Sequence, residues 1–281
     1  MNNRCGIKTI SSSKPTIEGA GVRLKRVFGF NVAPQLDPFL LLDDFHSDNP
    51  VDYMAGFPWH PHRGIETVTY VLKGAVEHGD SIGNKGVISV GDVQWMTAGG
   101  GIIHQEMPQK ADGIWGFQLW LNLPASHKMS APRYRGVPGK EIPVVKVNDG
   151  ITAKVIAGNI NEVQGPVQDL VVDVEYLDLS FSPGKKFLHP VKEGYKSLAY
   201  IIEGEGSFSE GGETTVHEHL VLFDVGDHIC ALAGSKGMRF LFISGKPLSE
   251  PVAWNGPIVM NTREELDTAF REYREGTFIK K

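Results

Sequence analysis

Apolar and polar residues alternate along most of this chain in short runs rather than at helical spacing. Val22–Lys25 and Leu177–Phe181 alternate one by one, as strands with a single buried face do. Phe39–Leu42 and Phe240–Ile243 are continuously apolar, which is typical of strands buried on both faces. The 33 glycines and 17 prolines are scattered among these runs and favour tight turns. The pattern predicts an all-β protein.

A helix is expected only near the C-terminus. Thr262 and Glu265 have the spacing of a capping box, in which each residue satisfies a free backbone N–H of the first turn. The apolar residues that follow recur at helical spacing, and they are Leu266, Ala269, Phe270 and Tyr273. We therefore expect one short C-terminal helix after the strands.

Length and composition set the frame for this fold. The 281 residues suit two domains, and 41% hydrophobic with 22% charged residues is an ordinary globular balance. A formal charge of −5 argues against direct nucleic-acid binding. Cys5 and Cys230 are too few for a disulfide framework. Neither a signal peptide nor a membrane span is visible, so a cytoplasmic protein is expected.

Two stretches of the chain occur twice. Gly64–Gly74 resembles Gly194–Gly204, and Val90–Asp92 recurs as Val225–Asp227 in the same order. Such repetition predicts two copies of one β domain. The polar segment at residues 148–164 separates the copies, so we expect an N-terminal domain at residues 1–148 and a C-terminal domain at residues 149–281.

Two pairs of potential metal ligands lie in the first copy. His60 and His62 are two residues apart, as are His104 and Glu106, so each pair presents two donors on the same face of a strand. Pairs on neighbouring strands can converge on one ion and leave two exchangeable positions if that ion is octahedral. Three imidazoles and a carboxylate suit iron, manganese, nickel, copper, zinc or cobalt, and the donor set does not choose among these metals.

The surroundings of the two pairs support a site. Gly56 and Gly64 flank the first pair and Gly99–Gly101 precedes the second, which permits positive φ angles and close backbone approach. In the second copy the equivalent positions hold none of these ligands: they are Pro190, Lys192, Arg239 and Leu241, with His189 one residue out of register. A single metal ion, in the N-terminal domain, is therefore expected.

Together, Trp59–Tyr70 and Gly91–Pro108 resemble the signature of the pirin family, whose members are bicupins of the cupin superfamily. The likeness is dense from Phe57 to Leu123, and Gly256–Thr262 near the C-terminus also resembles the family. The resemblance implies two cupin-type β-barrel domains and an iron ion in the first. By the family's motif, its ligands would be His60, His62, His104 and Glu106.

Two further polar residues are interpreted as supporting the ligands. Glu66 lies four residues after His62, where cupins in general place a ligand carboxylate, but in the pirin pattern Glu106 already supplies that group. Glu66 is therefore expected to be structural or to lie behind the ligands. Gln118, on an apolar strand, must find hydrogen-bond partners if buried. It could orient a substrate or a bound water, or make an ordinary core contact.

Of the residues around the motif, we expect some to lie at the protein surface and others to line the cavity. Arg63 and His78 are expected to be solvated, and the Asp43–Asp44 pair to form a turn at a strand end. Candidates for apolar walls of the cavity are Phe57, Trp59, Met96 and Trp115.

Two functions remain open on these grounds. The resemblance implies a metal-dependent dioxygenase that opens the ring of flavonols such as quercetin, a quercetin 2,3-dioxygenase, with Glu106 accepting the substrate's proton. The alternative, which the resemblance also implies, is a regulator that binds a protein partner, either as a transcriptional co-regulator or as a modulator of a metabolic enzyme; the enzyme is slightly favoured. A complete ligand set permits the chemistry of the first without excluding the second.

Overall fold

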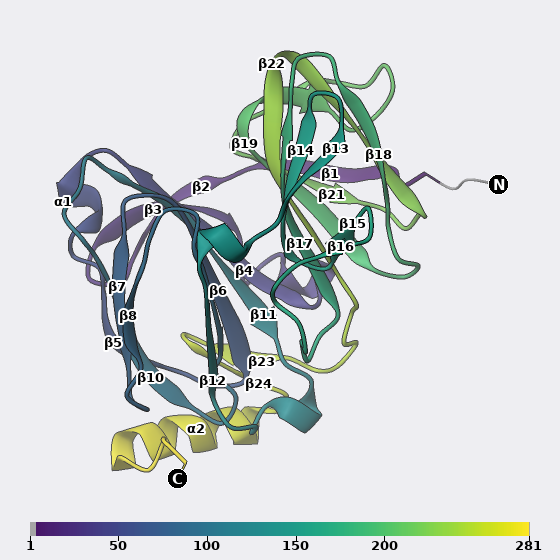
Figure 1. The fold of residues 1–281 in the computed structure, drawn as a ribbon. Helices are drawn as coiled ribbons and strands as arrows, with labels where there is room; N and C mark the ends of the chain where they lie inside the picture. Colours follow the sequence, from purple (N-terminus) through teal and green to yellow (C-terminus); the bar gives the residue numbers. More distant parts are fainter. Residues whose placement is uncertain (1–3, 281) are drawn as a thin grey trace. The chain divides into compact units, whose positions relative to one another are not determined.

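The computed structural model describes residues 4–280 and divides them into two compact units, each built mainly of β-strands (Figure 1). The first unit contains Lys14–Lys140 and the segment from Leu248 onward. The second contains the segment up to Ser13 and Glu141–Pro247. The C-terminal segment therefore belongs to the first unit, and the N-terminal segment belongs to the second. The domain limits of 1–148 and 149–281 stay a prediction.

Two antiparallel sheets form the first unit. The larger runs in the order β12 (Arg133–Val137), β9 (Val93–Thr97), β6 (Ile65–Lys73), β11 (Ile114–Asn122), β4 (Phe39–Ser47), β3 (Val22–Phe28) and β2 (Lys14–Glu18). The smaller runs β5 (Phe57–His62), β10 (Ile102–Pro108), β7 (Val76–Asp80) and β8 (Lys85–Ile88). Leu24, Val71 and Ile114 of the larger sheet pack with Val76 and Ile88 of the smaller. The two sheets thus enclose one apolar core, as a barrel does.

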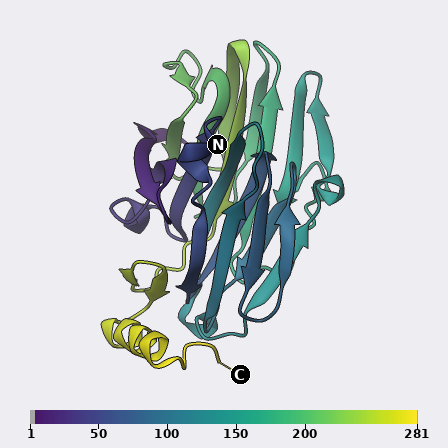
Figure 2. The same ribbon diagram turned by 90° about the vertical axis from the view of Figure 1, so that its left-hand side faces the viewer.

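The C-terminal segment adds a hairpin and a helix to the first unit. The hairpin is β23 (Ala253–Asn255) with β24 (Ile258–Met260), and α2 (Arg263–Glu275) lies beside it in both views (Figures 1 and 2). The other helical elements are α1 (Pro50–Tyr53) and three short 3₁₀ turns at Ala33–Gln35, Ala125–His127 and Gly139–Glu141. No helix among residues 4–280 has the length and apolarity needed to cross a membrane.

The second unit is one large antiparallel sheet that curls around its own core. Its order is β1 (Ile7–Ser12), β21 (His219–Phe223), β19 (Lys196–Ser207), β22 (His228–Gly245), β17 (Val174–Phe181), β14 (Ile151–Ala157) and β13 (Val144–Asn148). Off this path, β18 (Lys186–Pro190) pairs with β22 and β20 (Thr215–Val216) with β19, while β15 (Asn159–Ile160) pairs with β16 (Val163–Gln164). Fully buried aliphatic and aromatic side chains fill it, among them Leu177, Ile201 and Phe240.

The hydrophobic pattern placed these strands correctly, but Leu177–Phe181 does not have a single buried face, because Asp178 is buried too and accepts hydrogen bonds from Arg239. Val22 and Leu24 are buried while Arg23 between them is exposed, as alternation predicted. Every residue of Phe39–Leu42 and of Phe240–Ile243 is buried. The C-terminal helix is also confirmed: Thr262 and Glu265 make both hydrogen bonds of the capping box, and Gly276 ends the helix in the left-handed conformation.

The prediction of a turn at Asp43–Asp44 is wrong. Both residues lie within β4, which continues to Ser47, and both are buried. The neighbouring strand explains this, since Arg26 and Lys25 on β3 stand directly opposite Asp43 and Asp44. The Arg26 guanidinium donates two hydrogen bonds to Asp43, at 2.9 and 2.8 Å. A cation supplied across the sheet therefore lets a carboxylate stay inside the strand.

The capping box makes the stability of α2 testable. Thr262→Ala removes the hydroxyl that accepts the Glu265 backbone N–H, so we expect a loss of about 1 kcal/mol in the free energy of unfolding. Chemical denaturation followed by circular dichroism measures this. Thr268→Ala, in the interior of the same helix, is the matched control and should change stability by less. Equal effects at both positions would show that the cap contributes nothing specific.

Candidate metal centre

Three imidazole rings meet where β5 and β10 pair. His60 stands directly opposite His104 in the antiparallel register, and His62 lies two residues further along β5. The ring centroids are 4.4 Å apart for His60 and His104, 4.8 Å for His60 and His62, and 5.0 Å for His62 and His104. Their ligand atoms all lie within 4.8 Å of one another. The spacing of two therefore brings the three histidines together as predicted.

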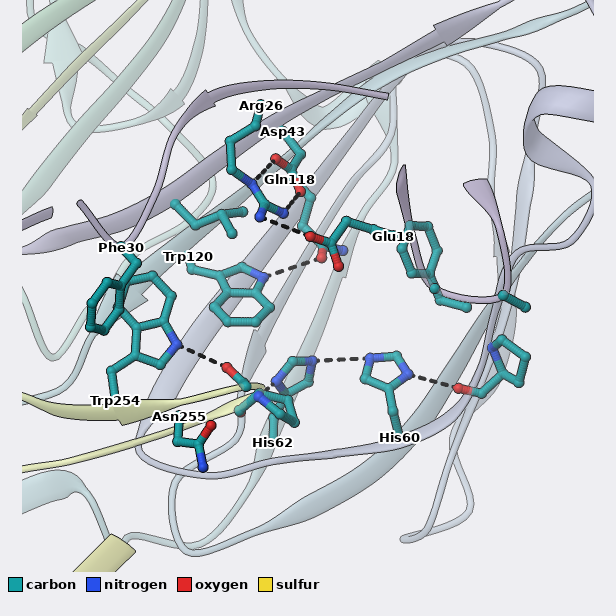
Figure 3. Close-up of a pocket in the computed structure, with 17 residues that line it drawn as sticks. Glu18, Arg26, Phe30, Asp43, His60, His62, Gln118, Trp120, Trp254 and Asn255 are labelled. Carbon is teal, nitrogen blue, oxygen red and sulfur yellow. Dashed lines mark hydrogen bonds and ion pairs between the residues drawn. The ribbon is translucent and has the colours of Figure 1, made fainter. Parts of the chain in front are cut away.

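Backbone carbonyls fix which nitrogen of the first two rings faces the cluster. Nδ1 of His60 lies 2.8 Å from the Pro58 carbonyl, and Nδ1 of His62 lies 3.0 Å from that of Pro257. A carbonyl can only accept, so each Nδ1 carries the hydrogen and each Nε2 keeps its lone pair. The two Nε2 atoms face each other at 3.1 Å (Figure 3).

This arrangement fits a metal ion. Two lone pairs that face each other at 3.1 Å repel unless a cation is shared, and Nε2 of His104 is buried without any hydrogen-bond partner. Adjacent ligands on an ion with metal–nitrogen bonds of about 2.1 Å are themselves about 3 Å apart. Burial, then the neighbouring imidazoles, lower the pKa of His62 and His104 well below its usual value. Both rings are therefore neutral at pH 7, which is the form that binds metals.

Glycines allow the chain to leave the cluster in tight turns. Gly64 follows the first pair with a φ of +77°, and a Cβ there would lie 1.9 Å from the Val259 carbonyl oxygen. Gly56, at the other end of β5, has a φ of +62°. The prediction of positive φ angles at these two positions is confirmed.

Arg63 does not lie at the surface, contrary to the prediction. It is buried, with its guanidinium 2.8 Å from the Glu272 carboxylate of α2 and 4.3 Å from the Phe278 ring centroid, and it donates to the Phe278 carbonyl at 2.9 Å. The C-terminal helix and the residues after it cover this arginine. Its local sequence could not reveal this, because the covering residues are more than 200 positions away.

Lys128 supports the same turn and was not singled out by the sequence. Its buried ammonium donates to the Gly64 carbonyl at 2.9 Å, to the Val259 carbonyl at 2.9 Å and to Oδ1 of Asn122 at 2.6 Å. All three N–H groups therefore have acceptors, which offsets much of the cost of burying the charge. No local signal marks Lys128, since its partners come from three separate segments.

Glu106 lies outside the cluster of three histidines. Its carboxylate is buried, and it accepts hydrogen bonds from the Thr69 hydroxyl at 2.9 Å and from Nε2 of Gln118 at 2.8 Å. Oε1 of Gln118 in turn accepts from the Trp120 indole at 3.2 Å. Gln118 thus links Glu106 to the pocket wall described below. Sequence reasoning missed Thr69, although it stands directly opposite Gln118 in the sheet.

Glu66 is also separate from the histidines. It is completely buried and accepts hydrogen bonds from the Trp95 indole at 3.1 Å and the Thr97 hydroxyl at 2.6 Å. Both donors lie on β9, the neighbour of β6, so Glu66 ties two strands of the larger sheet together.

His78, expected in solvent, is buried on β7. Its Nε2 lies 2.6 Å from the Tyr134 hydroxyl, which also accepts from the Gln94 amide at 2.7 Å. The two rings stack with centroids 4.8 Å apart. Burial lowers the pKa of His78 and raises that of Tyr134. The surface prediction failed because β12, which carries Tyr134, covers this position.

A pocket of about 760 Å³ opens beside His60 and His62 (Figure 3). Of the four predicted wall residues only Phe57 lines it. Trp59 is 51% exposed, Met96 lies in the apolar cluster against which Trp120 and Trp254 pack, and Trp115 stacks on His46. The aromatic wall consists instead of Trp120, Trp254 and Phe30. Trp254 belongs to the C-terminal hairpin, so strand patterns near the motif could not identify it.

Comparison with known proteins agrees with this architecture. The family model for pirin matches residues 21–121, and the model for the pirin C-terminal cupin domain matches residues 176–279. The chain belongs to the pirin family. A pirin-like protein of Caulobacter vibrioides is 43% identical to it over 271 residues, which cover 96% of this chain and 97% of that protein. The predicted bicupin fold is thereby confirmed.

Two solved structures share this fold. The crystal structure of quercetin 2,3-dioxygenase from Acinetobacter baumannii has 30% sequence identity to it, covers 98% of both chains and gives a TM-score of 0.89. The bacterial pirin YhhW from Escherichia coli, solved in complex with nickel(II), is 20% identical with a TM-score of 0.64, covering 85% of this chain and 100% of that one. The second likeness supports the fold alone.

Within residues 4–280 of this pirin, the three histidines are the only group of three or more potential ligands that could hold an ion. In the second unit, His189 is buried and has one carboxylate neighbour, Glu175, at 2.9 Å from its Nε2. The expectation that the second copy of the repeat lacks a metal site stays a prediction.

The contribution of Arg63 to the stability of the segment after His60 and His62 can be tested by substitution. Arg63→Met removes the ion pair to Glu272 and the hydrogen bond to Phe278, and we expect a loss of about 2 kcal/mol in unfolding free energy. This is less than for a fully buried pair, because the Glu272 side chain is 21% exposed. Denaturation of metal-free protein isolates the effect from metal binding. Arg271→Met, exposed on α2, is the control. An equally small loss of stability at both positions would contradict this stabilising role of Arg63.

Proposed function

We propose that this pirin is a metal-dependent dioxygenase that opens the ring of flavonols such as quercetin, with iron as its metal. The observation that carries the proposal is the convergence of three imidazoles, two of which line a pocket that also has an aromatic wall. The likeness to the A. baumannii quercetin 2,3-dioxygenase over 98% of both chains supports it.

His60, His62 and His104 would hold the ion through their free nitrogens, with Glu106 as the proposed fourth ligand. Iron follows from the family resemblance, and manganese, nickel, copper, zinc and cobalt are compatible with the same donors. When bound, the ion supplies Lewis-acid activation of a chelating hydroxyl and the redox chemistry of O₂. The protein's own part is to bind the substrate, exclude water and accept a proton.

The pocket's aromatic wall suits a flat substrate. Trp120 meets His62 edge to face with ring centroids 5.0 Å apart, and Trp254 follows at 6.2 Å from Trp120. Phe30 extends the row at 5.4 Å from Trp254 and is 64% exposed, which puts it at the outer end. Fused aromatic rings packed against this wall would bury apolar area while one end reaches the histidines.

Glu106 is proposed to accept the proton of the flavonol 3-hydroxyl. An imidazole that has given its lone pair to a metal cannot take up a proton, so the base must be another group. Glu106 lies two residues after His104 on β10, and the Thr69 and Gln118 hydrogen bonds fix the orientation of its carboxylate. Gln118 also lines the pocket, so the carboxylate lies directly behind the pocket wall.

The first test is the metal content. Freshly purified protein should hold at most one equivalent of tightly bound metal, and His62→Ala/His104→Ala should hold almost none, because two of the three nitrogen ligands, the two buried ones, are gone. Elemental analysis with paired circular dichroism spectra measures this without any activity assay. Two tightly bound equivalents in the wild type would contradict a single site in the first cupin domain.

The second test distinguishes the role of Glu106 as a metal ligand from its role as a base. Glu106→Gln keeps an oxygen donor but loses the basic carboxylate, so quercetin turnover should fall by roughly 10²- to 10⁴-fold at equal metal content. The matched control is Glu66→Gln, which alters another buried carboxylate of the same barrel and should keep its metal. Samples must be matched in metal, since a weaker site would imitate lost catalysis.

Turnover by Glu106→Gln within a few-fold of wild type would remove Glu106 from the role of base. An absence of turnover in iron-loaded wild type across several flavonols would overturn the enzyme and favour a regulator that binds a protein partner.

A further inference from the structure

A compact polar cluster occupies one wall of the otherwise aromatic pocket. Glu18, Arg26 and Asp43 all line it, and in the view of Figure 3 the Trp120 indole lies between this cluster and His62. The residues come from three adjacent strands, β2, β3 and β4, so the sheet itself sets their positions. The proposed mechanism uses none of them.

Asp43 holds Arg26 in one orientation. Its two oxygens accept from Nε and Nη2 at 2.9 and 2.8 Å, which is the bidentate geometry of an ionised pair. Burial raises the pKa of Asp43, and the Arg26 guanidinium opposes that rise. Because Asp43 is buried and fully paired, its role in the cluster is to position the guanidinium.

Glu18 completes the cluster and leaves it with free hydrogen-bonding capacity. Oε1 of Glu18 lies 2.8 Å from Nη1 of Arg26, whereas the other oxygen, Oε2, has no partner among the described residues. A guanidinium has five N–H groups, and three are used here, so two remain to donate. One positive and two negative groups give the cluster a formal charge of −1.

We propose that Glu18 and Arg26 form a specificity-determining subsite that binds a ring hydroxyl of a neutral, flat polyphenol at the end remote from the histidines. The hydroxyl would donate to Oε2 of Glu18 while its oxygen accepts an N–H from Arg26. A carboxylate at that position of the ligand would meet a net negative cluster and could not donate. The subsite would therefore select hydroxylated rings over unsubstituted or carboxylated ones, and it rests on the proposed flavonol chemistry.

The charge of Glu18 and Arg26 and their exposure to water determine how strongly the subsite should affect ligand affinity. A hydrogen bond to a charged group discriminates strongly against a ligand that lacks the hydroxyl, because the protein's polar atoms are then left unpaired in the complex. The Glu18 side chain is 40% exposed and that of Arg26 is 28% exposed, so water can replace part of the lost bond. We expect about a tenfold contribution to affinity, at the low end for such contacts.

The test is equilibrium binding, followed by quenching of tryptophan fluorescence with iron-loaded protein in the absence of O₂. Three ligands serve as probes: quercetin, 3-hydroxyflavone, which keeps only the chelating hydroxyl, and a flavonol with a carboxylate on the distal ring. Glu18→Ala should weaken quercetin binding about tenfold and change 3-hydroxyflavone binding less than twofold. Glu18→Gln, which is isosteric, should weaken quercetin less and strengthen binding of the carboxylated flavonol.

Glu275→Ala, an exposed acidic residue at the end of α2, is the control and should leave all three affinities unchanged. Equal losses for quercetin and 3-hydroxyflavone in both Glu18 variants would overturn the subsite, even if quercetin is turned over. The expected ligand-dependent pattern without any turnover would retain the subsite and refute the dioxygenase. The two proposals therefore fail on different measurements.

Discussion

The hydrogen-bond requirement of a buried imidazole governs the centre of this protein. Each ring has two nitrogens, and burial makes an unpaired nitrogen costly. In His60 and His62 one nitrogen donates to a backbone carbonyl, which leaves the other to face the shared space between the rings. For His62 that carbonyl belongs to Pro257, 195 positions away. The orientation of the His62 ring therefore depends on a hairpin from a distant part of the chain.

Three consecutive residues, His62, Arg63 and Gly64, depend on this C-terminal segment. His62 uses the Pro257 carbonyl, Arg63 uses Glu272 and Phe278, and Gly64 fits against Val259 where a side chain could not. The Val259 backbone N–H also donates to the Arg63 carbonyl at 3.1 Å. The family resemblance at Gly256–Thr262 thus has a physical basis, because residues of this segment pack against the turn at His62–Gly64. The hairpin contributes no imidazole itself, yet it contacts all three of these residues.

The buried carboxylates of the first unit differ in role because their partners differ. Glu66 accepts from an indole and a hydroxyl within the sheet, so it joins two strands. Glu106 accepts from Thr69 and from Gln118, a residue of the pocket wall, so it is held beside the pocket. Asp43 has a guanidinium as its partner and orients it toward the pocket.

The sequence by itself determined the strands, the repeat, the capped helix and the meeting of three histidines. The strands and the helix follow from local periods, since residues two apart share a strand face and Thr262 caps a helix through a residue three positions on. The repeat is visible directly in the sequence, and the meeting of the histidines needed, besides a shared strand face, the pairing of β5 with β10. The tertiary structure alone decided that Arg63 and His78 are buried, that Trp120 and Trp254 rather than Trp59 line the pocket, and that Asp43 stays in a strand. Each of these depends on a side chain or strand that arrives from a distant segment. Alternation along one strand fixes which residues share a face, but the burial of that face is fixed by what packs on it.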